Sequence, residues 1–458
     1  MKIPEIPPIF NSDFIDEMGG NVELIQLLLN PAIKPCDSKG RYQHWEKLKH
    51  LDTPKGYTSE LYWHATKFAR DKISRSLPFV DKHGNPFNYC LPDTVLEQLL
   101  WVSSQATGAV ADDPKITDPK TRRTYLINSL IEEAINSSQL EGAATTRAVA
   151  KEMIRTERKP KDKSEQMILN NYTAMRFISE FIDDQLTPSM VFELHKILTN
   201  ETLEEGYEYK AGVFRSEDDD ICVEWDDGTT LHVPPPANEL KTRLDLVCGF
   251  ANGVNEEGNN FIPPIIRAIV VHFMIGYDHP FYDGNGRTAR ALFYWVMAKS
   301  GFWLMEYVSI SRVIKSKPGS YMKAYLHTET DSNDVTYFIV HQLAVVKQAI
   351  EDLHGYLIKK TEELQSTETA LSKSPLQGLL NHRQLTLVRN AMQNPGAQYT
   401  VKSHQKSHGV ALQTARTDLL RLSDDYGVLR KLKEGKTDVF VAPKDLLEVI
   451  KRFQRQST

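Results

Sequence analysis

The spacing of apolar residues predicts a chain that is mostly helical. One set recurs every three or four positions between residues 126 and 135: Leu126, Ile127, Leu130, Ile131, Ala134 and Ile135. This spacing is typical of a helix with one buried face, which we expect over about 124–142. Continuous apolar runs over 265–273 and 291–297 predict two further helices that are buried on all sides.

A shorter alternating pattern predicts a β-hairpin just before these buried helices. The residues on its two sides are Ile221, Cys222 and Val223, then Leu231, His232 and Val233. An Asp-Asp-Gly turn separates them, and Asp-Gly between alternating apolar residues is a strong hairpin signal. Three prolines at 234–236 end the second strand, because proline cannot donate a hydrogen bond to a neighbouring strand.

The last part of the chain, from about residue 376 to 458, has the pattern of a separate small domain. We expect helices at 381–392, just after 399–401 and at 411–422, and a hairpin that turns at Glu434, Gly435 and Lys436 and ends at 439–441. Three helices followed by a hairpin are typical of a winged helix. A polar segment at 361–369 reads as a linker or the end of a helix.

A winged helix contacts DNA or another protein, and the residues leave both possibilities open. In the DNA-binding form the third helix enters the major groove. The candidate contacts are Gln413, Arg416, Arg421, Lys431, Lys433 and Lys436. Asp418, Asp424 and Asp425 reduce the positive charge of that surface, which favours a protein contact or a homodimer.

The remaining regions are less regular. Residues 1–110 are expected to form a mainly helical region, with a turn-rich connection at Asp81–Phe87. Residues 111–360 then hold the predicted helix at 124–142, the hairpin and the two buried helices. The expected organisation is therefore three parts, with bounds at 1–110, 111–360 and 376–458.

Composition narrows the class of protein. The chain has 458 residues, of which 41% are hydrophobic and 25% charged, with a net charge of −5. These values are ordinary for a globular protein and give no polybasic surface for nucleic acid or membranes. The four cysteines, Cys36, Cys90, Cys222 and Cys248, have no metal-binding spacing and are expected to be free thiols. Without a signal sequence or a long apolar span, we expect a cytoplasmic protein with no membrane contact.

The chemistry concentrates between residues 279 and 290, which read His-Pro-Phe-Tyr-Asp-Gly-Asn-Gly-Arg-Thr-Ala-Arg. Glycines at a helix start let backbone N–H groups approach an anion, and the helix end adds positive potential. Two arginines on the first helical turns can bind phosphate oxygens. Asp283 is a hard oxygen ligand suited to Mg²⁺, and His279 is a candidate general base. The stretch therefore predicts a site for a polyphosphate with Mg²⁺.

The same residues match, without a mismatch, the signature of the Fic (filamentation induced by cyclic AMP) domain, His-Pro-Phe-x-Asp/Glu-Gly-Asn-Gly-Arg-x-x-Arg. The resemblance implies a helical core that transfers AMP from ATP to a Ser, Thr or Tyr hydroxyl of a target protein, self-modification included. It implies that His279 deprotonates this hydroxyl and that Asp283 holds Mg²⁺. It also implies phosphate contacts from Gly284, Asn285, Gly286, Arg287 and Arg290.

A second segment resembles an inhibitory motif of the same family, Ser/Thr-x-x-x-Glu-Gly/Asn. Here it reads Ser137-Ser138-Gln139-Leu140-Glu141-Gly142. Ser137 and Glu141 are four residues apart and share a helix face, and Gly142 supplies a helix stop. The resemblance implies that Glu141 pairs with Arg290 and withholds it from the γ-phosphate. In some relatives this glutamate also helps water to remove AMP, so Glu141 could serve the reverse reaction.

Other positions follow the family pattern or depart from it. The hairpin at 221–233 resembles the flap that pairs with the target backbone. His272, Tyr321 and Tyr325 are expected mainly as core residues, although the tyrosines could line an adenine site. Two departures are Gly276, where an acid is common, and Asp278, where an apolar residue is common. Asp278 could orient His279, raise its pKa or face water.

Two alternative functions remain at this stage. The first keeps the fold but transfers UMP, phosphocholine or phosphate; the intact Gly284-Asn285-Gly286 run argues against phosphate. The second is a DNA-binding regulator in which the Fic core senses nucleotide without turnover. The complete set of motif residues argues against that inactive form.

Overall fold

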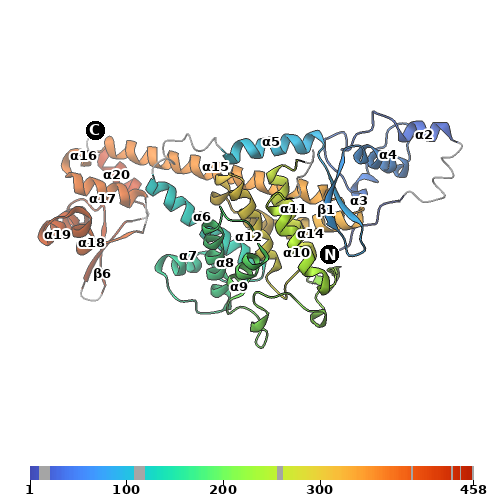
Figure 1. The fold of residues 1–458 in the computed structure, drawn as a ribbon. Coiled ribbons are helices and arrows are strands. Elements are labelled where there is room, and N and C mark those ends of the chain that lie inside the picture. The colour runs from blue at the N-terminus through green and yellow to red at the C-terminus, as the bar shows by residue number, and fades with distance from the viewer. Residues whose placement is uncertain are drawn as a thin grey trace. The chain divides into compact units, whose positions relative to one another are not determined.

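The computed structural model describes residues 1–9, 21–107, 119–254, 261–393, 396–434, 437–443 and 445–455. The fold is mainly helical and divides into two compact units, Met1–Glu351 and Asp352–Thr458 (Figure 1). The division falls within one long helix, α15 (Thr336–Ser372). The boundary expected at residues 110 and 111 lies outside the described residues.

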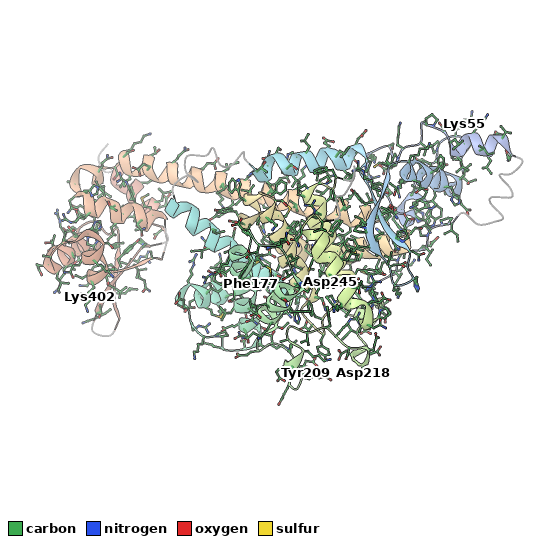
Figure 2. All side chains as sticks on the ribbon, in the orientation of Figure 1. Lys55, Phe177, Tyr209, Asp218, Asp245 and Lys402 are labelled. Atoms are coloured by element: carbon green, nitrogen blue, oxygen red, sulfur yellow. The ribbon has the colours of Figure 1, made fainter. Side chains whose placement is uncertain are left out.

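The centre of the first unit is the helix pair α11 (Pro264–Asp278) and α12 (Asn285–Lys299), which the two apolar runs predicted. Nearly every side chain of both helices is buried, because other helices cover them on all sides. The helices that pack against this pair include α8 (Lys163–Glu180), α9 (Pro188–Thr199) and α10 (Leu240–Ala251), and α7 (Arg147–Thr156) packs against α8. In Figure 2 side chains fill the space between these helices, whereas the exposed Tyr209 and Asp218 extend outward.

Helix α6 (Pro119–Leu140) is the helix predicted at about 124–142, and it begins five residues earlier than predicted. Its predicted apolar face is buried from Leu130 to Ile135. The buried Glu133 carboxylate accepts hydrogen bonds from Ser309 Oγ (2.7 Å) and from Ser311, where α13 (Ile310–Ser316) begins. Ser138 Oγ donates to the Met167 carbonyl of α8 (3.1 Å). These polar contacts and the apolar face together fix α6 within the first unit.

The N-terminal region differs in part from the mainly helical region that was expected. Its helices are α2 (Val22–Leu28), α3 (Trp45–Leu48), α4 (Ser59–Asp71) and α5 (Asp93–Thr107). Between α4 and α5 lies an antiparallel hairpin, β1 (Ser74–Val80) and β2 (Pro86–Cys90). The turn-rich connection is the turn of this hairpin, where the Asp81 carboxylate accepts hydrogen bonds from the His83 and Asn85 N–H groups (2.8 Å each).

A buried polar cluster fastens the N-terminal region to the loop between α14 (Pro318–Thr330) and α15. The Arg70 guanidinium, 1% exposed, donates to the Tyr337 hydroxyl and to two backbone carbonyls. Tyr337 donates in turn to Asp331 (2.7 Å), and Tyr42 donates to Asp334 (2.5 Å). Burying these groups is tolerated because each finds a partner.

The second unit contains the elements expected of the C-terminal part, in the predicted order. Its helices are α16 (Leu376–Leu379), α17 (His382–Gln393), α18 (Val401–His408), α19 (Leu412–Leu420) and α20 (Leu446–Arg455). The strands β5 (Gln398–Thr400), β6 (Arg430–Glu434) and β7 (Thr437–Val441) form an antiparallel sheet in the order β5-β7-β6. Helices α16 and α20 and strand β5 were not predicted. The turn residues Gly435 and Lys436 lie outside the described residues.

Among the candidate contacts of this unit, Gln413 and Arg416 are exposed on α19. Arg421 lies 3.5 Å from Asp425, and Lys431 lies 3.2 Å from Asp438. The expectation that Asp418 weakens a positive surface is wrong. Its side chain is buried and accepts hydrogen bonds from three residues of the same unit: Asn381, Arg383 and His404.

All four cysteines are free, as expected from their spacing. Among the described residues, no helix combines the length and the apolar character needed to cross a membrane.

We predict that Arg70→Met lowers the free energy of unfolding of this protein by about 3–5 kcal/mol, because it removes one charge from a buried ionic cluster. Arg41→Met is the matched control, since Arg41 forms an ion pair with Asp37 while 52% of its side chain is exposed. Its loss should cost less than about 1 kcal/mol. Urea unfolding followed by circular dichroism measures both, and equal costs would contradict the buried role of Arg70.

Candidate active site

The loop from His279 to Gly284 joins α11 to α12 and is held in place by the buried Phe281 ring and the Asn285 side chain. Phe281 is fully buried, with its ring stacked on that of His195 at 3.8 Å between centroids. The Asn285 side chain accepts a hydrogen bond from the Phe281 N–H (2.9 Å) and donates one to the Phe281 carbonyl (2.8 Å). Asn285, predicted to contact phosphate, therefore uses its side chain to close the loop.

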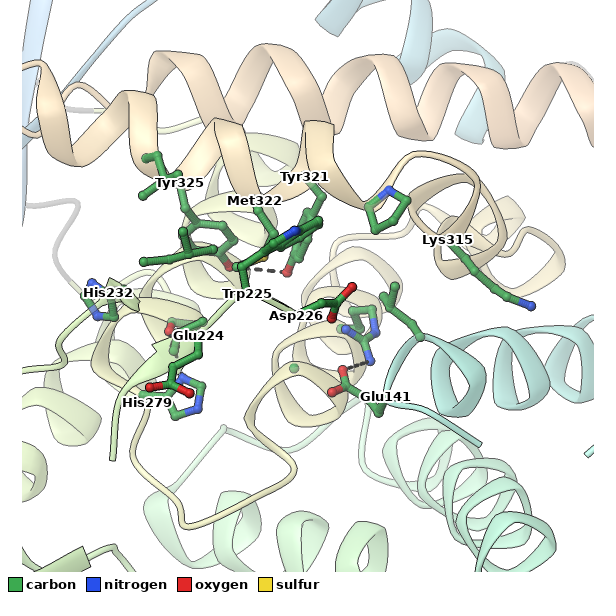
Figure 3. Close-up of a pocket in the computed structure, with 18 of the residues that line it drawn as sticks. Glu141, Glu224, Trp225, Asp226, His232, His279, Lys315, Tyr321, Met322 and Tyr325 are labelled. Atoms are coloured by element: carbon green, nitrogen blue, oxygen red, sulfur yellow. Dashed lines mark hydrogen bonds and ion pairs between the residues drawn. The ribbon is translucent and has the colours of Figure 1, made fainter. Parts of the chain in front are cut away.

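His279 lies at the edge of a cavity of about 510 Å³ in the first unit. Figure 3 shows Trp225, Tyr321 and Tyr325 on one side of this cavity, and His279 and Glu141 on the other. A cavity of this volume is in the range that holds a nucleotide-sized ligand. Its aromatic and apolar side suits a base, and its other side carries the predicted chemistry.

The His279 ring is held in one neutral tautomer. Its Nδ1 atom lies 3.2 Å from the Gly276 carbonyl, which can only accept a hydrogen bond. Nδ1 therefore carries the hydrogen, and Nε2 carries the lone pair. Burial lowers the pKa of the His279 ring to about 4, so the ring is neutral at pH 7.

Arg290 and Glu141 form the ion pair that the inhibitory motif implied. Their side chains meet at 2.7 Å, and Arg290 also donates to the Ser137 hydroxyl (3.0 Å) and carbonyl (3.2 Å). The Arg290 side chain is 2% exposed and that of Glu141 is 29% exposed. Helix α6 ends at Leu140, and Gly142 follows with a φ of 92°. The predicted contact is thus present.

The Glu141 carboxylate also lies against the first turn of α12. A Cβ atom at Gly286 would stand 2.5 Å from Glu141 Oε1, which is too close for a side chain. Gly284 precedes this turn in the left-handed conformation, with a φ of 83°. A helix N-terminus attracts anions through its unpaired N–H groups and its dipole. Glu141 therefore places a carboxylate where the sequence predicted a phosphate.

Asp283 and Arg287 form a second pair beside the loop. Asp283 is 48% exposed and lies 3.1 Å from Arg287, whose side chain is 1% exposed and also donates to the Leu198 carbonyl (2.9 Å). Arg287 was expected to bind outer phosphates, but its guanidinium is directed to Asp283 and α9, and it does not line the cavity.

Asp283 has the character expected of a Mg²⁺ ligand. Mg²⁺ usually binds through one or two carboxylates while phosphate and water supply its other ligands. Within the described parts of the chain, no group of three His, Cys, Asp or Glu residues could hold a metal by itself. A half-exposed carboxylate fits a metal that arrives with a nucleotide.

The predicted flap is a short antiparallel hairpin, β3 (Val223–Glu224) and β4 (Thr230–His232). Val223 and Ile221 are half-buried, and Cys222 and Val233 are exposed. Leu231 and His232 were expected to dock a target, but both side chains are buried. His232 contacts Glu329 (2.8 Å) and the Tyr277 carbonyl (2.7 Å).

Several cavity residues were not predicted as functional. Glu224, Trp225 and Asp226 reach it from the flap, and Met322 and Glu329 from α14. Their positions depend on how the flap and α14 pack, which no local pattern reveals. The spacing of Tyr321 and Tyr325 was a usable signal, since Tyr321 is buried, Tyr325 is half-buried and both line the cavity.

The two departures from the family pattern have local causes. A Cβ atom at Gly276 would clash with the Tyr325 hydroxyl, so a larger residue there requires the Tyr325 side chain to move. The Asp278 carboxylate is buried and bonds to Arg243 (3.2 Å), and it does not face water. Burial lowers the pKa of His279, and the groups that raise it are the Gly276 carbonyl and Glu141. His272 is fully buried and bonded to Tyr321 (2.9 Å), as expected of a core residue.

Comparison with known proteins finds a family model that matches part of the chain. Residues 185–297 match the model of the Fic/DOC family. This part of the chain is similar to a Fic domain. The match covers α9 to α12 and so includes the flap, the loop and the anion site.

Proteins similar to this one carry the same domain. A protein adenylyltransferase Fic from Nematostella vectensis is 25% identical over 173 residues, which cover 36% of this chain and 37% of that protein. Protein adenylyltransferase fic-1 from Caenorhabditis elegans is 41% identical over 59 residues, which cover 13% of this chain and 12% of that protein. The matched regions thus cover at most 37% of the length of these curated relatives.

Solved structures of Fic proteins are also similar. A Fic family protein from Desulfovibrio desulfuricans has a TM-score of 0.48 and 16% identity, covering 77% of this chain and 95% of that one. Fic-1 from C. elegans has a TM-score of 0.44 and 19% identity, covering 58% of this chain and 73% of that one.

We predict that the His279 ring stays neutral from pH 8 down to pH 5, because burial lowers its pKa to about 4. Nitrogen-15 NMR of histidine-labelled protein measures this, and a His279→Asn variant assigns the signal. A midpoint near the ordinary value of about 6.5 would show that the ring is solvated.

Proposed function

We propose that this protein is an adenylyltransferase that transfers AMP from Mg-ATP to a hydroxyl side chain of a target protein. The observation that carries the proposal is the position of a neutral His279, with its Nε2 lone pair available, beside the anion site at the start of α12. The names of the relatives that share the Fic domain support the same activity.

The reaction is an in-line displacement at the α-phosphate. The target hydroxyl oxygen forms a bond to the α-phosphorus, and the bond from this phosphorus to the oxygen that bridges to the β-phosphate breaks. Pyrophosphate leaves, and the hydroxyl proton passes to His279 Nε2. A Mg²⁺ ion held by Asp283 would neutralise charge on the phosphates. Arg287 keeps Asp283 in place through their 3.1 Å contact.

The phosphates are expected at the N-terminus of α12, where Gly284 and Gly286 leave room for close approach. Arg290 would bind the γ-phosphate, which its fork of N–H donors suits. The base would lie toward Tyr321, Tyr325 and Trp225 on the aromatic side of the cavity.

We further propose that Glu141 restrains the enzyme. While Glu141 and Arg290 pair at 2.7 Å, Arg290 is not available to the γ-phosphate, and the carboxylate repels it. The contacts of Glu133 and Ser138 hold the rest of α6 in the core. Relief therefore requires a local change only, in the turn that follows Leu140.

The target is expected to add a strand beside the flap, which binds main chain with little demand on sequence. Buried Leu231 and His232 would then support the flap from inside, and the more exposed residues, Ile221, Cys222, Val223 and Val233, would face the target. The free thiols support a reducing compartment such as the cytoplasm.

We predict that Glu141→Gly raises the rate of AMP transfer by between about 5-fold and 150-fold. This range corresponds to the typical coupling free energies between two linked sites. Covalent label from ATP marked at the α-phosphate measures the rate, with Mg²⁺ and the full chain. His279→Ala added to Glu141→Gly should abolish transfer, because no group then accepts the hydroxyl proton.

The matched control is Glu157→Gly, since Glu157 is also an exposed glutamate just beyond a helix end, that of α7. It should leave the rate unchanged. ATP labelled at the γ-phosphate and UTP labelled at the α-phosphate run in parallel. If ATP labelled at the α-phosphate leaves no label on protein, label from γ-labelled ATP would indicate phosphate transfer instead, and label from UTP would indicate UMP transfer. Equal rates for the parent and Glu141→Gly would refute the restraint.

A further inference from the structure

The end of α11 has an unusual residue at a position that normally suits glycine. The last four carbonyls of a helix lack partners within the helix. Many helices end at a residue in the left-handed conformation, usually glycine, because a Cβ atom is unfavourable there. In this chain the residue is His279, with φ 45° and ψ 56°. Other parts of the molecule must therefore hold this backbone in place.

Every carbonyl from Ile275 to Phe281 accepts a hydrogen bond. The Ile275 and Gly276 carbonyls accept from His279 N (3.1 Å) and His279 Nδ1 (3.2 Å), and the Tyr277 carbonyl accepts from His232 Nε2 (2.7 Å). Arg215 donates to the next three carbonyls, from Nη2 to Asp278 (3.3 Å), from Nε to His279 (2.7 Å) and from its backbone N to Pro280 (2.9 Å). The Phe281 carbonyl accepts from Asn285 Nδ2 (2.8 Å). The four carbonyls from Tyr277 to Pro280 are thus satisfied by only two residues, both outside the motif.

We propose that Arg215 and His232 are positioning residues for His279. They hold its backbone in the left-handed conformation, which directs Nδ1 to the Gly276 carbonyl and leaves Nε2 to face the cavity. The inference deepens the proposed function and rests on it, in that His279 is taken as the base. Arg215 does not line the cavity, whereas His232 lines it and directs its two ring nitrogens to Glu329 and to the Tyr277 carbonyl.

Arginine suits this task because its planar fork can serve several acceptors at once. Arg215 is 7% exposed, and its guanidinium reaches the carbonyls of Pro235 (2.5 Å), His279 and Asp278. The nearby Asp278 carboxylate is already engaged by Arg243 at 3.2 Å. The Arg215 donors are therefore directed to the backbone.

The same two residues tie the base to the flap. His232 belongs to β4, and its ring stands between the Tyr277 carbonyl and the Glu329 carboxylate of α14. Arg215 reaches Pro235, which follows the flap. A target strand that adds to the flap thus docks on the element that also fixes His279.

The experiment compares variants of these residues in the Glu141→Gly background. His232→Ala and Arg215→Met should lower kcat about tenfold or more, while the KM for ATP changes little, because the nucleotide contacts remain. His232→Gln and Arg215→Lys each keep one donor and should recover part of kcat. The matched controls are His83→Ala and Arg176→Lys, both exposed and far in sequence from the site; they should match the parent.

A second readout does not depend on activity. In histidine-labelled full-length protein, the His279 Nδ1–H signal should be protected from exchange with water in the parent. It should shift and exchange faster in His232→Ala and Arg215→Met, but not in the controls. If the Glu141→Gly protein transfers no AMP, the proposed function fails, and this signal alone decides the positioning role.

Thermal unfolding of each variant shows whether it is still folded. If the Ala and Met variants unfold, the Gln and Lys variants carry the test, because each retains a donor. An unchanged kcat together with an unchanged His279 signal in the folded variants would overturn the proposal. A rise in the KM for ATP with kcat unchanged would also overturn it, since it would indicate a role in nucleotide binding.

Discussion

The site depends on the way α11 ends, because an imidazole occupies a left-handed position that usually suits glycine. Once the carbonyls there are satisfied from outside the helix, the loop to α12 has one conformation, and the Phe281 ring locks it into the core. That loop fixes both the ring of His279 and the start of α12. The position of His279 and that of the start of α12 are thus set by one short connection.

The Glu141–Arg290 pair lies at the start of α12, where a phosphate was predicted to bind. A carboxylate at a helix N-terminus gains from the same N–H groups and dipole that would bind a phosphate. Arg290 is almost fully buried, but Glu141 remains partly exposed. Separating the pair therefore leaves Glu141 with access to water, while Arg290 requires a replacement anion. Under the proposed function a phosphate would supply that charge, so the contact would suit regulation by exchange of anions.

The sequence predicted the parts of this site that depend on local rules. The motif, the buried helices α11 and α12, the helix α6 and the contact of Glu141 with Arg290 all follow from spacing or from the family pattern. The β1–β2 hairpin was missed because Pro78 interrupts the alternation of Leu77 and Phe79, and the pairing is irregular there. Asp418 was misplaced because a helix pattern does not show that Asn381, Arg383 and His404 surround it.

By itself, the sequence determined which residues are candidates for the chemistry, because glycine, acid, base and arginine at fixed spacing in one helix start have few uses. Only the tertiary structure decided where those side chains point. Arg287 faces Asp283 and not the cavity because α9 supplies a carbonyl for its second donor. His232 faces inward because Glu329 and the Tyr277 carbonyl, distant in the chain, come together around it. Partners of this kind come from separate elements, and their meeting depends on packing that no local pattern records.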